Sequence, residues 1–380
     1  MKILCVDIGT GTQDIFLYDS RLDVENGFKL VVPSPTMMIY RRLQEATRVR
    51  TAVALHGQTM GGGPSQWAAE THLRAGYAVY ATPAAARSFN DDLDVIRAMG
   101  ITLVSEDELA ALPADVLRLS MRDFDFSAIA RALGEFGAAL DDLTAVAVGV
   151  FDHGNAPPDY SDRLFRFDYI RQRLQAHNRL SAFAYRAADV PPIMTRLQAV
   201  AQAAPQIDAP VVVMDTAPAA VLGATLDKAV RARRRVLVAN LGNLHTLAFR
   251  LGPTGVEGVF EHHTGMLDRP KLDDLLQRLA SGTLQHEAVY QDQGHGAYIP
   301  FAQPLPLSDN GFGVAVTGPR RGLLVGSALR PYFAVPFGDM MLTGCFGLLN
   351  ATADLLPDLA PTIRASLFSE SSTGVAPWDF

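Results

Sequence analysis

The stretch Val6-Asp7-Ile8-Gly9-Thr10-Gly11-Thr12, near the start of the chain, decides the fold prediction. An apolar run from Lys2 to Val6 leads into it, and a second apolar run, Ile15 to Tyr18, follows at once. Two strands joined by a glycine and threonine turn form a hairpin, whereas a dinucleotide fingerprint needs a helix directly after its glycines. The sequence therefore predicts a hairpin and argues against a Rossmann fingerprint.

A turn of this composition points consecutive backbone N–H groups outward, where they can bind an anion. Gly9, Thr10, Gly11 and Thr12 would then hold phosphate groups. Asp7, at the first position, would hold a hydrated Mg²⁺ against those phosphates. The alternative is a plain tight hairpin with a buried aspartate, and the turn alone does not decide between them.

A similar turn comes much later in the chain, within Asn240-Leu241-Gly242-Asn243-Leu244-His245-Thr246. It too lies between apolar runs, Val236 to Ala239 and Leu247 to Leu251. Two such turns facing each other from separate domains would clamp a polyphosphate from both sides. We therefore expect Asn240, Gly242, Asn243, His245 and Thr246 to contribute to a nucleotide site.

Between the two turns, apolar runs of strand length alternate with helical segments. The runs cover residues 51–55, 77–81, 101–104, 145–151 and 210–214. Ser105 and Glu108 form a capping box, and Ser181 to Ala204 is long enough for a crossover helix. Such alternation predicts an α/β protein with a largely parallel sheet and helices on its faces.

Composition limits the classes of function. The chain has 380 residues, of which 48% are hydrophobic and 19% charged, and its length predicts two or three domains. A net charge of −7 argues against a nucleic-acid partner, since such proteins present a basic face. No apolar run approaches the ~18 residues that cross a bilayer, and Asp7 would interrupt a signal peptide. We expect a cytoplasmic protein without a membrane partner.

Five stretches in fixed order resemble the nucleotide-binding core of the actin, hexokinase and heat-shock chaperone ATPase superfamily. They are residues 6–12, 214–223, 236–246, 313–320 and 338–348. The first and third resemble its phosphate loops, the second its inter-domain helix, the fourth its adenosine-contacting turn and the fifth its helix returning to the first domain. The resemblance implies two ribonuclease-H-like domains of mixed sheets with flanking helices and an inter-domain cleft. It also implies ATP and Mg²⁺ as cofactors, with Asp215 and Gly318 in the nucleotide site.

The same resemblance implies a domain plan. We expect a first nucleotide-binding lobe over residues 1–225, carrying an α/β insertion at about 56–135, and a second lobe over 226–335. Residues 336–365 would return to the first lobe as a helix. Residues 366–380, rich in serine, would form a frayed tail.

Within that superfamily, the chain is most similar to a family of unknown function. Its members open with Asp-Ile-Gly-Thr-Gly-Thr-Gln-Asp, here residues 7–14, and carry Glu-His-His-Thr-Gly and Gly-His-Gly-Ala, here 261–265 and 294–297. The family often bears the label of pyruvate formate-lyase activating protein. Such activases hold an iron–sulfur cluster with closely spaced cysteine thiolates. Cys5 and Cys345, at opposite ends of the chain, argue against that chemistry.

Two departures from the superfamily pattern bear on activity. Asn240 stands where the second phosphate loop normally has an aspartate, and an amide carries no charge and cannot act as a base. Thr317-Gly318-Pro319 replaces the usual double-glycine turn at the adenosine. Both changes argue against a fast ATPase and leave nucleotide binding as the expectation.

Several histidines fall in loops beside glycines. His56 and the Asp152-His153-Gly154 run follow expected strands, at the ends where ligands of open α/β sheets bind. Asp152 or His153 would orient an attacking water or an acceptor hydroxyl. Asp152, His153, His245 and either His262 or His263 also form a ligand set for Mn, Fe or Zn. His262 and His263 are adjacent on an expected strand, so they would point to opposite faces.

Other residues receive structural interpretations. His72, His177 and His286 lie in expected helices or at their ends, and we expect them at the surface.

Three hypotheses stay open. The first is an ATP-dependent phosphotransferase or ATPase in which Asp7, Asp152 and His153 are catalytic and the acceptor is an unknown small molecule or protein. The second is a metalloenzyme on the same fold, with a transition metal and ligands drawn from Asp7, His153, His245, His262 and His263. The third is a regulator whose hinge angle, set by nucleotide, is recognised by a partner, and Asn240 favours it.

Overall fold

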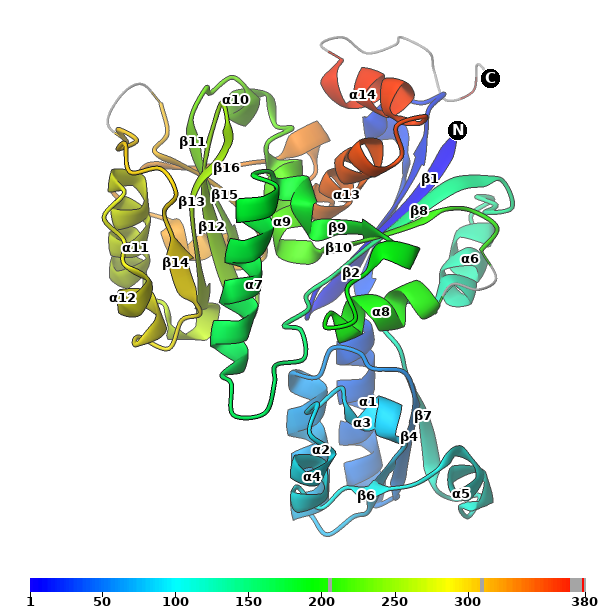
Figure 1. Cartoon of the computed structure of the whole chain (residues 1–380). Coiled ribbons are helices and arrows are strands. Elements are labelled where there is room, and N and C mark those ends of the chain that lie inside the picture. The colour runs from blue at the N-terminus through cyan, green and yellow to red at the C-terminus, as the bar shows by residue number, and fades with distance from the viewer. Residues whose placement is uncertain (204–206, 308–310, 370–377, 379–380) are drawn as a thin grey trace.

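The computed structural model describes residues 1–203, 207–307, 311–369 and 378, and three β-sheets organise them (Figure 1). The first six-stranded sheet defines the first lobe, the second six-stranded sheet defines the second lobe, and a smaller sheet forms what we call the four-stranded unit. In Figure 1 the second lobe is on the left, the first on the right and the four-stranded unit below. Most of the expected frayed tail lies outside the described residues.

The first sheet has the strand order β3-β2-β1-β8-β10-β9. The first three strands pair antiparallel, β8 and β10 continue the sheet parallel to β1, and β9 closes it antiparallel. The strands are β1 (Lys2–Ile8), β2 (Thr12–Asp19), β3 (Phe28–Pro33), β8 (Leu143–Val150), β9 (Ala184–Arg186) and β10 (Val211–Asp215).

The second sheet has the order β14-β13-β12-β11-β15-β16. Here too an antiparallel run joins the first three strands, β11 to β13, and two parallel strands lie on the other side of β11. The strands are β11 (Val236–Leu241), β12 (His245–Gly252), β13 (Gly255–His263), β14 (Gly296–Tyr298), β15 (Val314–Thr317) and β16 (Pro331–Phe333).

The two lobes therefore repeat one topology. Strands β1, β2, β3, β8 and β10 of the first sheet correspond in order and direction to β11, β12, β13, β15 and β16 of the second. This duplicated arrangement is the paired ribonuclease-H-like fold of the actin-like ATPases. The structure confirms the predicted α/β class with two mixed sheets flanked by helices.

The four-stranded unit is a separate parallel sheet with its own apolar core. Its strands are β4 (Val53–Gly57), β5 (Val79–Ala81), β6 (Thr102–Leu103) and β7 (Leu117–Met121). Helix α1 (Pro35–Val49), whose N-cap Ser34 accepts from the amide of Met37, leads into the unit directly from β3. The four-stranded unit is therefore an insertion in the first lobe, between β3 and β8.

The remaining helices cover the sheets or connect them (Figure 1). Those of the four-stranded unit are α2 (Pro64–Arg74), α3 (Pro83–Ala86), α4 (Leu93–Ala98) and α5 (Glu106–Ala111). Those that follow in the first lobe are α6 (Phe126–Gly134), α7 (Asp162–Ala176), α8 (Thr195–Gln202) and α9 (Thr216–Ala224). The later ones are α10 (Lys228–Arg231), α11 (Arg269–Ser281), α12 (His286–Tyr290), α13 (Thr343–Leu355) and α14 (Ala360–Phe368).

Helices α9 and α13 pack side by side between the two lobes (Figure 1). A Cβ atom on Gly223 would lie 1.7 Å from the carbonyl oxygen of Thr343, and one on Gly347 would lie 1.8 Å from that of Ala219. Only glycine permits such backbone approach. The small residues of these stretches therefore set the distance between the helices.

Two expectations from the sequence are wrong. Within the described part of 181–204 the chain forms a 3₁₀ turn, the edge strand β9, another turn and the short helix α8, because Pro191 and Pro192 interrupt the helical pattern. His72 is fully buried and not at the surface, with its Nδ1 2.8 Å from Thr47 Oγ1 on α1. The capping box of Ser105 and Glu108 is confirmed.

In the described residues, no helix combines the length and the apolar character that crossing a membrane requires.

Candidate functional site

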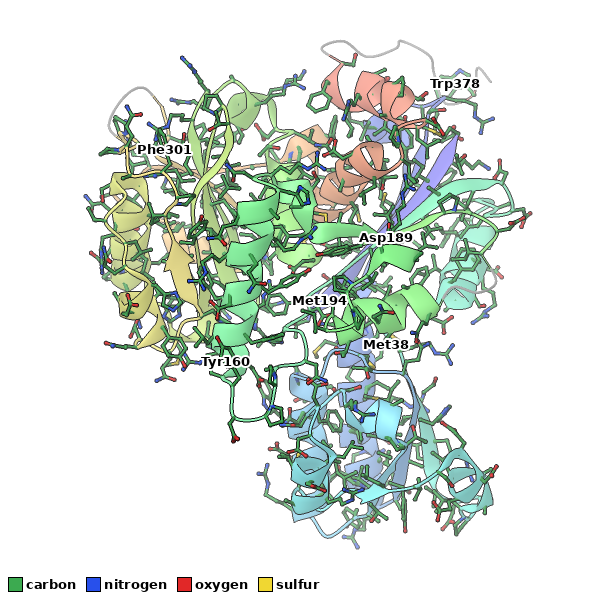
Figure 2. All side chains as sticks on the ribbon, in the orientation of Figure 1. Met38, Tyr160, Asp189, Met194, Phe301 and Trp378 are labelled. Carbon is green, nitrogen blue, oxygen red and sulfur yellow. The ribbon has the colours of Figure 1, made fainter. Side chains whose placement is uncertain are left out.

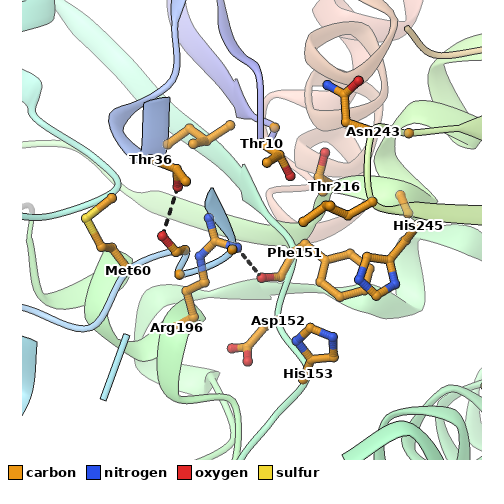
Figure 3. Close-up of a pocket in the computed structure, with 18 of the residues that line it drawn as sticks. Thr10, Thr36, Met60, Phe151, Asp152, His153, Arg196, Thr216, Asn243 and His245 are labelled. Atoms are coloured by element: carbon orange, nitrogen blue, oxygen red, sulfur yellow. Dashed lines mark hydrogen bonds between the residues drawn. The ribbon is translucent and has the colours of Figure 1, made fainter. Parts of the chain in front are cut away.

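A cavity of about 1030 Å³ lies where the two lobes and the four-stranded unit meet. Both glycine turns line it, together with the loop after β8, the glycine loop after β4 and the residues before α13. Figure 3 shows Thr10, Asn243 and His245 around the same space as Asp152 and His153.

The two glycine turns have the same internal hydrogen bond. The amide of Gly9 donates to the carbonyl of Thr12, and the amide of Gly242 donates to the carbonyl of His245, each over 2.9 Å. Because β1 corresponds to β11 and β2 to β12, the turns occupy equivalent positions in the duplicated fold. By this correspondence Asn240 is the counterpart of Asp7.

The turns also meet across the cleft. A Cβ atom on Gly11 would lie 2.8 Å from the side-chain nitrogen of Asn243. Residues more than 200 positions apart in the sequence thus face each other, and both turns line the cavity. This is the arrangement that a polyphosphate clamp requires.

Asp7 is buried at the floor of the cavity. Its Oδ1 accepts a hydrogen bond of 2.5 Å from Thr216 Oγ1, at the start of α9. Gly149 and Gly344 make room for the carboxylate, since a Cβ on either would lie within 3 Å of it. Burial, and then the charge of Asp215, raise the pKa of Asp7 to about 7 despite the hydrogen bond from Thr216.

Asp14 is the cross-strand partner of Asp7 in the hairpin, and the sequence analysis did not select it. Its Oδ1 is buried without a hydrogen-bond partner. Burial and the neighbouring Asp7 raise its pKa to about 8. Two buried carboxylates, one with an unpartnered oxygen, form a hard oxygen donor set that a divalent cation such as Mg²⁺ fits.

Asn240 and Gly318 line the second-lobe side of the cavity. Gly318 has φ of +94°, and a Cβ there would lie 2.5 Å from the carbonyl oxygen of Leu241 and 2.6 Å from Asn240 Oδ1. Both the dihedral angle and the close approach require glycine. The turn after β15 is thereby held against the end of β11.

Asp152 and His153 follow β8 and line the cavity. The carboxylate of Asp152 accepts from the amides of Gly154 and Leu197, each over 2.8 Å, so it fixes the loop after β8 against α8. Burial raises its pKa although these bonds and two arginines oppose the shift. His153 is exposed to the cavity.

Arg196 on α8 ties the loop after β8 to the four-stranded unit. It donates to the carbonyl of Phe151 over 2.6 Å (Figure 3) and forms an ion pair of 2.6 Å with the buried Asp123. Thr36 makes a second link, donating to the carbonyl of Gly61 over 2.9 Å (Figure 3). The glycine loop after β4 therefore forms a fixed wall of the cavity.

Four histidines lie close together on the side of the loop after β8 that faces the second lobe. The ring centroids of His153, His245, His263 and His295 are separated by 4.7–6.1 Å in the contacting pairs. Although the side chain of His153 opens to the cavity, the protein that encloses the cavity desolvates its ring, and this desolvation together with the neighbouring imidazoles lowers its pKa well below the usual value. Burial likewise lowers the pKa of His263 to about 4 and that of His295 to about 3. These three imidazoles are therefore neutral near pH 7.

Behind the histidines lies a buried charge network. Arg166 on α7 forms ion pairs with Asp215 at the end of β10 and, over 3.2 Å, with Glu261 on β13. All three side chains are nearly inaccessible to solvent. Burial opposes ionisation of Glu261, but Arg166 and the neighbouring histidines lower its pKa overall. The network joins the two lobes, and burial raises the pKa of Asp215 even though Arg166 opposes the shift.

Three residues that the sequence assigned to the site lie outside the cavity lining. Asp215 is occupied by Arg166 and by capping α9. Thr246 is fully buried and shares a hydrogen bond of 2.9 Å with Thr264. His262 lies on the opposite face of β13 from His263, where its Nε2 is 3.3 Å from Asp292. The other assigned residues line the cavity: Asp7, Gly9, Thr10, Gly11, Thr12, Asp152, His153, Asn240, Gly242, Asn243, His245, His263 and Gly318.

Sequence reasoning missed Asp14 and His295 as site residues. Asp14 was visible as the residue that pairs with Asp7 once a four-residue turn is assumed. His295 was visible as a histidine between two glycines, but its distance in sequence from His153 and His245 gave no sign of contact.

A family model described as "Putative pyruvate format-lyase activating enzyme (DUF1786)" matches residues 60–323, and the chain belongs to this family. The description is at odds with the cysteines, because Cys5 and Cys345 are the only two in the chain and both are buried. An iron–sulfur cluster needs more thiolate ligands than two. No curated protein matches the chain.

Two solved structures are similar over most of their length. One is the inorganic polyphosphate/ATP-glucomannokinase from Arthrobacter sp. strain KM, with 15% identity, 94% of this chain and 99% of that chain covered, and a TM-score of 0.36. The other is the ROK hexokinase from Thermus thermophilus, with 13% identity, 91% and 98% covered, and a TM-score of 0.29. At these values neither similarity adds to the argument from topology.

Proposed function

We propose that this protein binds ATP with Mg²⁺ in the cavity between its lobes and transfers a phosphoryl group to an acceptor. One observation carries the proposal. Two equivalent glycine turns of a duplicated fold converge on one cavity, with Gly11 opposite Asn243. Neither turn alone would distinguish a phosphate site from an ordinary hairpin.

The position of each cavity residue suggests its role in the proposed phosphoryl transfer. The turns Gly9 to Thr12 and Gly242 to Asn243 would hold the phosphates, through amides other than those of Gly9 and Gly242, which donate within their own turns. Gly318 would lie beside the nucleoside. Asp7 and Asp14 would hold Mg²⁺, which neutralises charge on the phosphates. The loop after β8, with Asp152 and His153, would orient the acceptor hydroxyl or water. Phosphoryl transfer depends mainly on such positioning and charge neutralisation.

Asn240 limits the reaction. Its counterpart in the first lobe is Asp7, so the second turn has an amide where the first has a carboxylate. The amide accepts a hydrogen bond but cannot take a proton. The only strand-end carboxylate near the acceptor side that we assign is Asp152, and we therefore expect slow hydrolysis and a dependence on the correct acceptor.

Calorimetric titration of the full chain with ATP and ADP, with and without millimolar Mg²⁺, tests the proposal. We expect Mg²⁺-dependent ATP binding, and loss of that binding in Asp7→Asn, which keeps the size of the side chain. Asp142→Asn is the matched control, because Asp142 is exposed and pairs with Lys2 away from the cavity. Flat titrations of the folded wild type with both nucleotides would contradict the proposal.

A further inference from the structure

The cavity wall contains a group of side chains that phosphate binding does not use. His153, His245 and His295 each offer a ring nitrogen, and these three atoms lie within 4.8 Å of one another. They come from three separate segments, namely the loop after β8, the second glycine turn and the residue before β14. We propose that these three histidines bind a divalent transition-metal ion of the Zn²⁺ or Co²⁺ class.

His295 gives the strongest reason. Its side chain is fully buried, and neither Nδ1 nor Nε2 has a hydrogen-bond partner. A buried imidazole without partners costs free energy unless something else satisfies it. A metal ion bound to one nitrogen would remove part of that cost. The nitrogen distances also fit, since ligands of a tetrahedral Zn²⁺ lie ~3.3 Å apart and small side-chain rotations close the difference.

Glu261 supports the site from behind. Its Oε1 lies 3.2 Å from His245 Nδ1, and its backbone carbonyl accepts from the amide of His295 over 2.9 Å. A carboxylate on one ring nitrogen fixes the imidazole so that the other nitrogen faces the metal. Metal-binding histidines commonly have this support. Here neither His245 Nδ1 nor Glu261 Oε1 makes a hydrogen bond, so a small rotation of the ring on metal binding would bring the two together and leave Nε2 for the metal.

The local charge also favours a cation. The carboxylate of Glu261, whose pKa is lowered, lies just behind the imidazoles, 3.2 Å from Nδ1 of His245. Three protein ligands leave a coordination position toward the cavity, as in catalytic metal sites. His263, 4.7 Å from His295 between ring centroids, borders the site without belonging to the three.

The site differs from the proposed Mg²⁺ site in chemistry. Imidazole nitrogens prefer Zn²⁺ and similar ions, whereas the oxygens of Asp7 and Asp14 prefer Mg²⁺. The inference therefore does not depend on nucleotide binding. A titration without nucleotide, in millimolar Mg²⁺ to occupy oxygen sites, tests it separately.

The experiment titrates chelator-treated full-length protein with Co²⁺ and follows the visible absorption of the bound ion. We expect one Co²⁺ per chain, displaced by Zn²⁺. His153→Ala and His295→Ala should weaken binding by more than about 100-fold, since loss of even a supporting residue costs 10–100-fold. His177→Ala, at an exposed position, is the control and should bind as wild type does.

A loss of metal binding in these variants can be distinguished from a loss of folding. His153 is exposed, so its replacement leaves the core intact, and circular dichroism checks each variant. X-ray absorption of the wild type with Zn²⁺ counts imidazole ligands independently, with three expected. Absence of stoichiometric Co²⁺ or Zn²⁺ binding, or wild-type affinity in His153→Ala, would overturn the site and leave a cluster of neutral packed histidines.

Discussion

Asp91 lies on the cavity wall beside residues of like charge. Partial burial, followed by the charges of Asp152 and Asp162, raises its pKa to about 6. A carboxylate whose pKa is higher in the folded state than in the unfolded state binds protons more strongly when folded. Its contribution to stability is therefore complete below about pH 4 and is lost as the pH rises through about 6.

We expect Asp91→Asn to remove this pH dependence. At pH 7 the variant should be more stable than the wild type by about 1 kcal/mol, a value reduced for solvent screening of the partly exposed side chain. Near pH 4 the two should be equal. Urea unfolding at both pH values measures the difference, with the exposed Asp115→Asn as control. Equal gains at the two pH values would contradict the assignment of charge.

At the residue scale, the sequence predicted many of the residues that line the cavity, because their motifs are local patterns. The glycine turns and Asp7 were recognisable from neighbours within seven positions. The alternation of a strand also explains why His263 and not His262 reaches the histidine cluster. Asp215 was misplaced because its pattern shows a helix cap but not Arg166, which comes from 49 positions away.

Helices α9 and α13 form the element-scale contact on which the lobes depend. Their approach is limited by backbone atoms, since a Cβ on Gly347 would be 1.8 Å from one carbonyl oxygen and 2.9 Å from the amide of Gly223. Backbone cannot rotate away as a side chain can. Any added atom must separate the helices.

We expect Gly347→Ala to lower the free energy of unfolding by at least about 2 kcal/mol through overpacking. Gly134→Ala is the matched control, because Gly134 also lies in a helix and a Cβ there would meet nothing within 4 Å. It should be neutral or stabilising by up to ~1 kcal/mol. Thermal and urea unfolding compare the two. Similar effects of both substitutions would show that the helix contact is looser than described.

At the element scale, the sequence predicted strands better than connections. The strands of both hairpins followed from apolar runs of the sequence. The helix expected over 181–204 rested on the length of the segment, and it does not form as one helix because Pro191 and Pro192 interrupt it. Edge strand β9 is only three residues long and gives too short a pattern to recognise.

Across the whole molecule, Arg166 joins the two lobes. From α7 it reaches Asp215 in the first sheet and Glu261 in the second, and its guanidinium lies 4.4 Å from the ring centroid of Phe151. Tyr160 lies just before this helix, at the end that approaches the cavity (Figure 2). This link could not be predicted from the sequence, because it needs three distant segments to meet.

We expect Arg166→Met to destabilise the protein by about 3–5 kcal/mol, because it leaves two buried carboxylates without their partner. Arg171→Met on the same helix removes a half-exposed ion pair with Asp168 and should change stability by less than about 0.5 kcal/mol. Urea unfolding monitored by circular dichroism compares the variants. A loss below 1 kcal/mol for Arg166→Met would mean that the network does not hold the lobes together.

The meeting of Gly11 with Asn243 has a consequence for how the cleft closes. Apart from its two chain neighbours, no described residue of the first lobe lies within 4 Å of where a Cβ of residue 11 would be, and the close contact is with Asn243 of the opposite lobe. A single methyl group at this position would not disturb its own hairpin, but it would hold the two lobes apart at this point. Because Gly11 has no side-chain carbon, the two lobes can touch at this point.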